Sequence, residues 1–297
     1  MNDGPDLTFV VIPLLGGPAL ERCIAALRRT PAAILVVGRM TAALSESLRS
    51  RGLTPIDSDA PVPRRRAIGA AAAGTEWISF CEDTCEIDPT WYPAFETVRA
   101  LCESDAWSGP IEIEADLPQR CVALAALEYG EFGADRWARL ATAPGRAWRP
   151  VRRLAGLNLL YRAAALPAPI PPEGLIETDV HERARAQGRP LAMHPGLAVK
   201  YSSTDLAAAT LASRHAHGRI YGGGMRARLS ALSRALALAK CTVLPLVLGA
   251  RGFAGLPASH RRNLVTLAWL AGFAIAWSAG EATGLLCGRG ASIEAWR

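Results

Sequence analysis

The chain has 297 residues, 50% hydrophobic and 20% charged, which is enough for one large α/β domain with an appendage. Its net charge of +6 comes in short clusters, and no basic face interleaved with aromatic residues stands out. This pattern argues against nucleic-acid binding and for attraction to an anionic membrane or to phosphorylated substrates. The seven cysteines include no CxxC pair, which argues against a disulfide framework and for a reducing compartment. The abundance of Ala, Arg, Gly and Pro is typical of a high-GC bacterial genome.

Apolar runs rich in β-branched residues alternate with segments of helical spacing in the first part of the chain. We predict strands over residues 7–12, 34–37 and 76–81, and helices over residues 19–29, 41–51 and 64–73. Strands that are apolar along their whole length are buried on both faces, which is typical of a parallel sheet with helices on each side. The predicted fold class is therefore α/β, with a mostly parallel sheet flanked by helices.

The middle of the chain is less regular. We expect a helix from about Pro89 onward, a half-exposed strand over residues 111–114, a helix over residues 119–132 and a strand over residues 154–162. A Pro-rich loop over residues 166–173 then leads to a helix over residues 176–187, which carries Glu177 and Asp179 near its start. These elements complete a predicted catalytic domain over residues 1–225.

The C-terminal part, residues 226–297, is predicted to be a hydrophobic helical region. The run 236–248 is apolar apart from Lys240, and the longer run 264–287 carries a single acid, Glu281. A segment of about 20 apolar residues is long enough to cross a bilayer, although two buried helices of a soluble domain are the alternative. We favour membrane association, and leave open whether either helix spans the membrane or lies in its interface.

Two acidic residues directly follow the strand predicted over residues 76–81. In open parallel sheets, ligands bind beyond the carboxyl ends of the strands, so Glu82 and Asp83 are placed where chemistry is expected. The alternative is a solvated acidic turn. Both side chains can bind one metal ion only if the backbone turns there, because successive side chains on a strand point to opposite faces.

Several motifs, in order, resemble those of family 2 glycosyltransferases, which have the GT-A fold. The resemblance covers nearly the whole chain. It begins with the run Val10-Val11-Ile12-Pro13 and continues with the segment Arg66-Ala67-Ile68-Gly69 and the acidic block to Asp83. Further along it includes Gly156-Leu157-Asn158 with Arg162, the segment from Glu177 to Arg183, and Gly280-Glu281 with Gly284. The acidic block, followed by Pro89 and Trp91, resembles that of the subgroup in which the acidic motif is Glu-Asp-His.

The resemblance implies a donor side built from Pro13, Arg66, Glu82 and Asp83. A divalent ion, Mg²⁺ or Mn²⁺, would neutralise the diphosphate leaving group there, held by Glu82, Asp83 and Thr84. In the family the two acids are two positions apart, so Thr84 stands where a second carboxylate is usual, and a hydroxyl is a weaker ligand. Arg66 would contact the diphosphate or support the acidic loop, and the three consecutive arginines 64–66 are equally well explained as solvated surface.

The resemblance also implies a catalytic base and an acceptor side. Glu177 stands at the position of the family's catalytic acid, and Asp179 is the second candidate. Acids in the first turn of a helix also stabilise the helix dipole, which is the alternative explanation for both. Gly156 and Asn158 correspond to a strand on the acceptor side.

Two basic residues further along the chain are predicted to contact the acceptor. Arg214 and Arg219 flank His215 and His217, and we expect these residues in a mobile loop near a phosphorylated acceptor, with a His metal pair as the alternative.

The predicted function is that of an inverting glycosyltransferase that moves a sugar from a nucleotide-sugar donor to a lipid-linked or surface-polysaccharide acceptor. The alternatives are an inactive membrane-bound relative and a nucleotidyltransferase, although the latter would want a basic residue between Leu14 and Pro18. Residues 1–6 lack the basic start and the cleavage site of a secretory signal. We therefore expect the enzyme at the inner membrane, with its catalytic domain facing the cytoplasm and its role in cell-envelope polysaccharide synthesis.

Overall fold

The computed structural model describes residues 6–134, 137, 148–206 and 209–296, and these form two compact units. The first unit comprises Met1–Glu112 and Trp137–Tyr201, and the second comprises Ile113–Arg136 and Ser202–Trp296. The predicted boundary at residue 225 separates a catalytic from a membrane-associated region and stays a prediction. Residues 1–5, on which the predicted lack of a secretory signal depends, lie outside the described residues.

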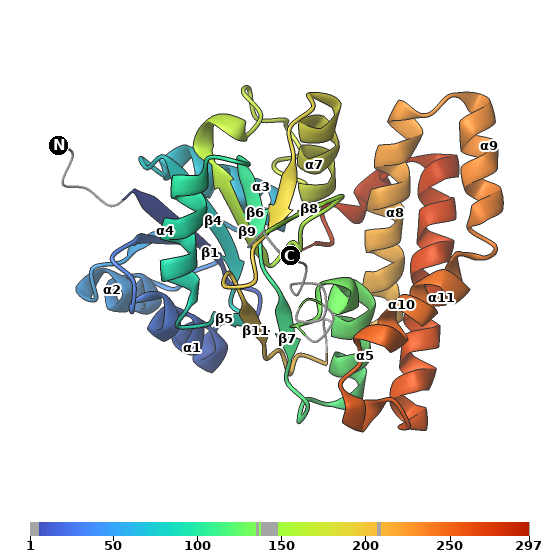
Figure 1. Ribbon diagram of the computed structural model, residues 1–297, viewed down its shortest axis with the longest axis horizontal. Helices are drawn as coiled ribbons and strands as arrows, with labels where there is room; N and C mark the ends of the chain where they lie inside the picture. Colours follow the sequence, from blue (N-terminus) through green and yellow to red (C-terminus); the bar gives the residue numbers. More distant parts are fainter. Residues whose placement is uncertain (1–5, 135–136, 138–147, 207–208, 297) are drawn as a thin grey trace. The chain divides into compact units, whose positions relative to one another are not determined.

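An eight-stranded sheet runs through the first unit in the order β3-β2-β1-β4-β9-β6-β10-β8 (Figure 1). Its strands are β1 (Leu7–Ile12), β2 (Ala33–Gly38), β3 (Thr54–Asp57), β4 (Trp77–Glu82), β6 (Ala106–Ser108), β8 (Arg149–Val151), β9 (Asn158–Arg162) and β10 (Leu191–Met193). The four strands from β3 to β4 are parallel, and β9 is antiparallel to β4 and β6. The predicted fold class, a mostly parallel sheet flanked by helices, is confirmed.

The helices of the first unit bury their apolar sides against this sheet. They are α1 (Gly17–Leu27), α2 (Ala42–Ser50), α3 (Val62–Ala72), α4 (Trp91–Leu101) and α7 (Glu177–Ala186). Every residue of β1 and β4 is buried, as their apolar sequences predict. On α4, the ring of Trp91 lies 5.1 Å from that of Phe9 on β1, so this helix is fixed on the central strands.

A second, three-stranded sheet in the order β5-β11-β7 is built from short strands. These are β5 (Cys85–Ile87), β7 (Ile111–Ile113) and β11 (Val199–Tyr201). The half-exposed strand predicted near residue 111 is confirmed, because Ile111 and Ile113 are buried and Glu112 is exposed. Since β5 begins two residues after β4 ends, the chain must turn at Asp83 and Thr84.

The second unit is helical. It contains α5 (Gln119–Tyr129), α8 (Leu211–Arg228), α9 (Ala231–Lys240), α10 (Leu244–Gly255) and α11 (Leu264–Cys287), the last matching the predicted run 264–287. Helices α8 and α11 run side by side (Figure 1) and approach so closely that only glycine fits between them. A Cβ at Gly218 or Gly222 would overlap the backbone of α11, and one at Gly280 or Gly284 would overlap the backbone of α8.

Two predictions for this unit were wrong. The apolar run 236–248 is not one helix, because α9 ends at Lys240 and α10 begins at Leu244 with Pro245 in its first turn, and the two helices are bent by 58°. Residues 214–219 are not a mobile loop but the first half of α8. The side chain of Thr210 starts this helix by accepting a hydrogen bond from the N–H of Ser213, in a capping box.

Candidate functional site

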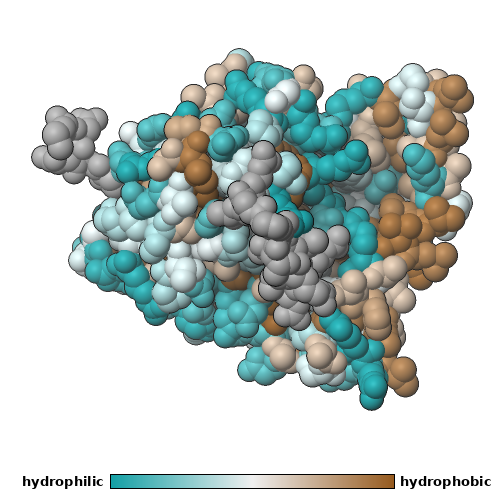
Figure 2. Space-filling model, viewed as in Figure 1, coloured by the Kyte–Doolittle hydropathy of each residue, from teal (hydrophilic) through white to brown (hydrophobic). Residues whose placement is uncertain are grey.

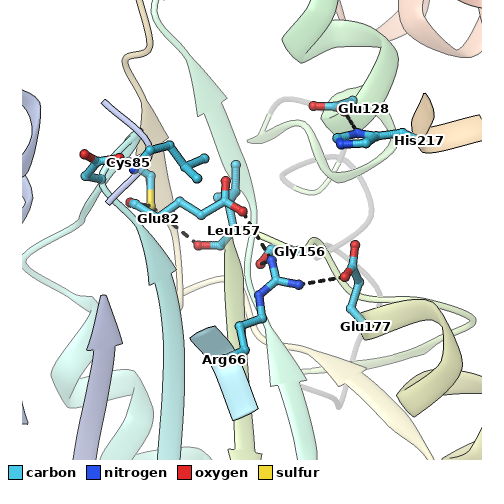
Figure 3. Close-up of polar contacts among 10 residues, drawn as sticks. Arg66, Glu82, Cys85, Glu128, Gly156, Leu157, Glu177 and His217 are labelled. Carbon is cyan, nitrogen blue, oxygen red and sulfur yellow. Dashed lines mark hydrogen bonds and ion pairs between the residues drawn. The ribbon is translucent and has the colours of Figure 1, made fainter. Parts of the chain in front are cut away.

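Four of the predicted site residues meet around the guanidinium of Arg66 (Figure 3). Its Nη1 lies 2.7 Å from Oε2 of Glu177, and its Nη2 lies 3.2 Å from Oε1 of Glu82. The same Nη2 donates a hydrogen bond of 3.0 Å to the carbonyl oxygen of Gly156. The cluster thus joins α3, the carboxyl end of β4, the segment before β9 and the first residue of α7.

The Arg66 cluster, defined as Arg66, Glu82, Gly156 and Glu177, places two carboxylates against one buried cation. Burial disfavours the charged guanidinium, but the facing carboxylates of Glu177 and Glu82 raise the pKa of Arg66 above its ordinary value. Burial also raises the pKa of Glu82, and the adjacent Arg66 partly offsets this. With both acids ionised, the three side chains carry one net negative charge in a place from which water is largely excluded.

Glu177 is the member of the Arg66 cluster that reaches solvent. Its side chain is 19% exposed, compared with 2% for Arg66 and 9% for Glu82. One carboxylate oxygen, Oε2, binds Arg66, while Oε1 lies over Gly156, where a Cβ would be 3.1 Å away. A glycine at position 156 therefore leaves room for the carboxylate of Glu177 and for the guanidinium of Arg66. Asp179, the second candidate base, lies half-buried in the same first turn of α7.

A buried Tyr–His pair that the sequence analysis did not single out fixes α7 on the sheet. The hydroxyl of Tyr161 on β9 lies 2.8 Å from Nε2 of His181, one turn after Glu177 on α7. Burial, with a smaller contribution from Arg66, lowers the pKa of His181 to about 3, so the ring is neutral at physiological pH. Burial also raises the pKa of Tyr161, which therefore keeps its proton. His181 lies within a segment that carries the resemblance, and that was its only signal in the sequence.

Asp83 fixes the loop that follows β1. Its carboxylate accepts hydrogen bonds from the backbone N–H groups of Leu14, Leu15 and Gly16, at 2.7–3.2 Å. Burial raises the pKa of Asp83, and these three bonds counteract that effect by stabilising the ionised form. Pro13, predicted on the donor side, lies at the start of this loop, and its carbonyl oxygen accepts a hydrogen bond from Nη1 of Arg65.

The turn between β4 and β5 is held by sulfur as well. The thiol of Cys85 donates to the carbonyl oxygens of Glu82 and Leu157, at 3.2 and 3.5 Å (Figure 3). Burial raises the pKa of this thiol well above its ordinary value, so it stays protonated and acts as a donor. These bonds join the acidic turn to the segment that contains Gly156.

The predicted metal ligands, as they lie, do not fit a divalent ion. Both oxygens of Asp83 are bound by backbone N–H groups, Glu82 is paired with Arg66, and Thr84 is a buried hydroxyl. Oxygen ligands for Mg²⁺ or Mn²⁺ must have lone pairs directed at the ion, and here both oxygens of Asp83 and Oε1 of Glu82 face N–H donors instead. Throughout the parts of the chain that the structure describes, no group of three His, Cys, Asp or Glu residues has the arrangement of a metal site. The metal stays a prediction.

Asn158, predicted on the acceptor side, is a buried support. Its Nδ2 donates to the carbonyl oxygen of Leu197 at 2.8 Å, and its Oδ1 accepts from Nε1 of Trp91 at 3.3 Å. Both ends of the amide are therefore used to connect β9 with the loop before β11 and with α4.

Arg214 and Arg219, the other predicted acceptor-side residues, belong to the second unit. Arg214 is buried and forms an ion pair with Glu128 of α5. Nδ1 of His217 lies 3.7 Å from the same carboxylate (Figure 3). Nε of Arg219 donates to the carbonyl oxygen of Gly288. In this unit both arginines hold helices together, and their predicted contact with an acceptor stays a prediction.

We compared the sequence and the structure with those of known proteins. No protein-family model and no curated protein matches the sequence. The mannosyltransferase PcManGT from Pyrobaculum calidifontis, solved with GDP-Man and Mn²⁺, matches with a TM-score of 0.56 at 12% identity, over 94% of this chain and 88% of that one. GalNAc-T7, solved with UDP, GalNAc and Mn²⁺, gives a TM-score of 0.49 at 12% identity over 68% of this chain, which spans 45% of that protein. The match to PcManGT shows that the protein has the fold of GT-A glycosyltransferases.

Proposed function

We propose that the protein is an inverting glycosyltransferase that moves a sugar from a nucleotide-sugar donor to a hydroxyl group of a lipid-linked or surface-polysaccharide acceptor. The observation that carries this proposal is the Arg66 cluster. It brings a partly exposed carboxylate, Glu177, to the carboxyl end of β4, the edge of the sheet where ligands of parallel α/β folds bind. The fold shared with a nucleotide-sugar-dependent mannosyltransferase supports the same reaction class.

Glu177 is the proposed general base. As the acceptor hydroxyl oxygen attacks the anomeric carbon, its proton passes to Oε1 of Glu177, while Oε2 stays bound to Arg66. The bond between the anomeric carbon and the diphosphate oxygen breaks, and the nucleoside diphosphate leaves with the electron pair. Attack from the face opposite the leaving group inverts the anomeric centre. The hydrogen bond from Arg66 holds the carboxylate of Glu177 in one orientation, which is what a base of this kind requires.

The donor side is proposed to lie along the loop after β1. Asp83 fixes the backbone of residues 14–16, and Pro13 stands at the end of β1, so this loop has a defined shape before the donor binds. Arg39 follows β2 directly and is exposed, which suits contact with a diphosphate. Because Glu82 and Asp83 are engaged with Arg66 and with backbone N–H groups, we propose that the diphosphate is neutralised by basic side chains more than by a metal ion.

The test compares two glutamate variants. Glu177→Gln keeps an oxygen for Arg66 but removes the base, and Glu173→Gln changes an exposed residue of the preceding loop. We expect Glu177→Gln to lower the release of nucleoside diphosphate from nucleotide sugars by about 100-fold or more. Binding of the nucleoside diphosphate itself should be unchanged in both variants, as measured by calorimetry with a panel of diphosphates. Normal turnover by Glu177→Gln would refute the assignment of the base.

A catalytically inactive relative is the second candidate, and one observation favours it. Two of the three predicted metal ligands, Glu82 and Asp83, are engaged by Arg66 and by backbone N–H groups, as they would also be in an inactive protein that had lost its ion. Donor-dependent release of nucleoside diphosphate by the wild-type protein, abolished in Glu177→Gln, would exclude this candidate. Diphosphate binding without any turnover would favour it.

A further inference from the structure

Helices α9 and α10 of the second unit leave most of their apolar side chains exposed. No residue of α9 is buried, and in α10 the only buried residue is Gly252. Six large hydrophobic side chains of this segment are 44–76% exposed, and we call them the α9–α10 face: Leu232, Leu236, Val243, Leu246, Val247 and Phe253. Figure 2 shows hydrophobic surface gathered over these helices within the second unit.

An exposed apolar face of this kind indicates a surface that binds a partner. Most of the stability of a short helix comes from burying its apolar side, and α9 and α10 have 10 and 12 residues. Exposed apolar side chains scattered singly are common on protein surfaces, whereas six within one continuous segment indicate an interaction site.

The charge of the surrounding chain indicates which partner. From Leu206 to Gly280 the sequence contains nine Arg and Lys residues and no Asp or Glu. Arg228, Lys240 and Arg262, which precede, separate and follow the two helices, are all exposed. An apolar face combined with one-sided positive charge is what an anionic bilayer attracts, since basic side chains bind the headgroups while apolar ones enter the boundary with the acyl chains.

Helix α11 has the length and composition of a membrane span, but its packing opposes crossing. Its backbone contacts that of α8 at two glycines of each helix, Gly218 and Gly222 on α8 and Gly280 and Gly284 on α11, so α11 cannot enter a bilayer without α8. Helix α8 carries Arg214, Arg219 and two histidines, which are costly to bury in hydrocarbon. In addition, Glu281 of α11 is buried and accepts a hydrogen bond from Nε1 of Trp277. These contacts are those of a helix inside a folded protein.

We propose that the second unit binds the surface of an anionic membrane through the α9–α10 face, with α9 and α10 lying in the interface and no helix crossing the bilayer. Each helix is too short to span about 30 Å of hydrocarbon, and the 58° bend between them is suited to lying along a surface. This proposal does not rest on the proposed transferase activity, because it concerns other residues and a different ligand.

The test uses the full-length chain and vesicles of defined composition. We expect it to sediment with phosphatidylcholine vesicles that contain about 30 mol % phosphatidylglycerol, and at least about tenfold more weakly with phosphatidylcholine alone or at high salt. The variant L232D/L246D should bind the anionic vesicles at least about tenfold more weakly, since it places charge in the apolar face. The control is L101D, which changes an exposed leucine of the first unit and should bind as the wild type does.

Four results would overturn the proposal. If the folded wild type does not bind anionic vesicles, or if L232D/L246D binds as well as wild type, the face has no role at the membrane. If the wild type is a dimer in solution and L232D/L246D is a monomer without any difference in vesicle binding, a second copy of the chain covers the face. If alkaline carbonate fails to extract the wild type from cell membranes, a helix crosses the bilayer.

Discussion

Glu82 and Glu177 bind different nitrogens of the same guanidinium, that of Arg66. One of these carboxylates is buried at the end of a strand, and the other stands at the start of a helix and reaches solvent. Arg66 therefore fixes the proposed base on the sheet and also compensates the charge of a largely buried acid, Glu82. Its two functions, structural and electrostatic, cannot be separated by removing it.

We expect Arg66→Ala to destabilise the protein strongly. The substitution leaves Glu82 buried beside a second carboxylate without the cation that compensates them, and breaking a buried pair in this way costs about 3–5 kcal/mol. Arg64→Ala, which changes the exposed arginine two positions earlier, should alter the free energy of unfolding by less than about 0.5 kcal/mol. Urea unfolding of the three proteins measures both values, and equal stability of the two variants would contradict the central place given to Arg66.

The neutral, buried His181 makes stability depend on pH. Its pKa is about 3 in the folded protein and near 6.5 when unfolded. Its contribution is therefore complete above pH 6.5 and is lost as the pH falls from 6.5 towards 3, by about 1.4 kcal/mol per pH unit. Glu82 acts in the opposite sense, because its raised pKa lowers the free energy of unfolding as the pH rises above the ordinary pKa of a glutamate. Variants must therefore be compared with wild type to isolate the contribution of His181.

The comparison needs His181→Gln and Tyr161→Phe. The first removes the titrating ring, so we expect its free energy of unfolding to fall less steeply than that of wild type between pH 6.5 and 4. The second removes the hydrogen bond to His181 but leaves the ring buried, and should keep the slope of the wild type at a lower absolute stability. Denaturant unfolding at a series of pH values measures the slopes. The same slope in His181→Gln and wild type would show that this ring does not titrate as described.

Asp83→Asn distinguishes an anchor of the loop from a metal ligand. The amide offers one acceptor oxygen to three N–H groups, so we expect the variant to lose about 1–3 kcal/mol of stability and to bind nucleoside diphosphate more weakly. If Asp83 acts through residues 14–16, the loss of binding is the same with Mn²⁺ and with EDTA. If it is a ligand, the loss is confined to the samples with Mn²⁺. The control, Asp59→Asn, changes an exposed acid nearby and should have no effect in either condition.

The sheet and the longest helix could be predicted because their signal is local. Strands β1 and β4 are continuous apolar runs buried on both faces, and α11 is a long apolar segment with Asn263 as its N-cap. Burial alone sets the bounds of such elements. The three-residue strands β6, β10 and β11 have no comparable signal, because too few side chains are present to show an alternation.

The sequence did not predict helix α8, because its local signal opposes a helix. Its three consecutive glycines, Gly222–Gly224, have low helix propensity, and its basic and His residues are typical of a loop. What stabilises it is the close approach of α11, which is distant in the sequence and needs glycine at positions 218 and 222 of α8. A tertiary contact of this kind overrides local propensity and has no local sequence signal.

The sequence predicted most residues of the candidate site but not the hydrogen bonds and ion pairs that connect them. The motifs named Arg66, Glu82, Gly156 and Glu177 separately, and nothing in their spacing shows that one guanidinium holds the other three. Tyr161 has no signal at all, because a tyrosine in an apolar strand is common and its partner His181 is on another element. Asp83 was expected to face an ion, and the N–H groups that bind it belong to a loop far away in the sequence.

The glycine contact between α8 and α11 also limits how the second unit can move. If α8 slid along α11 by one turn, about four residues, Arg214 or Arg226 would take the place of a contacting glycine, where even a Cβ would overlap the backbone of α11. The two helices are thus locked in register and behave as one rod. The chain between them, which includes α9 and α10, is attached to that rod at both ends, so bending and tilting of this segment are the motions that remain when it meets a surface.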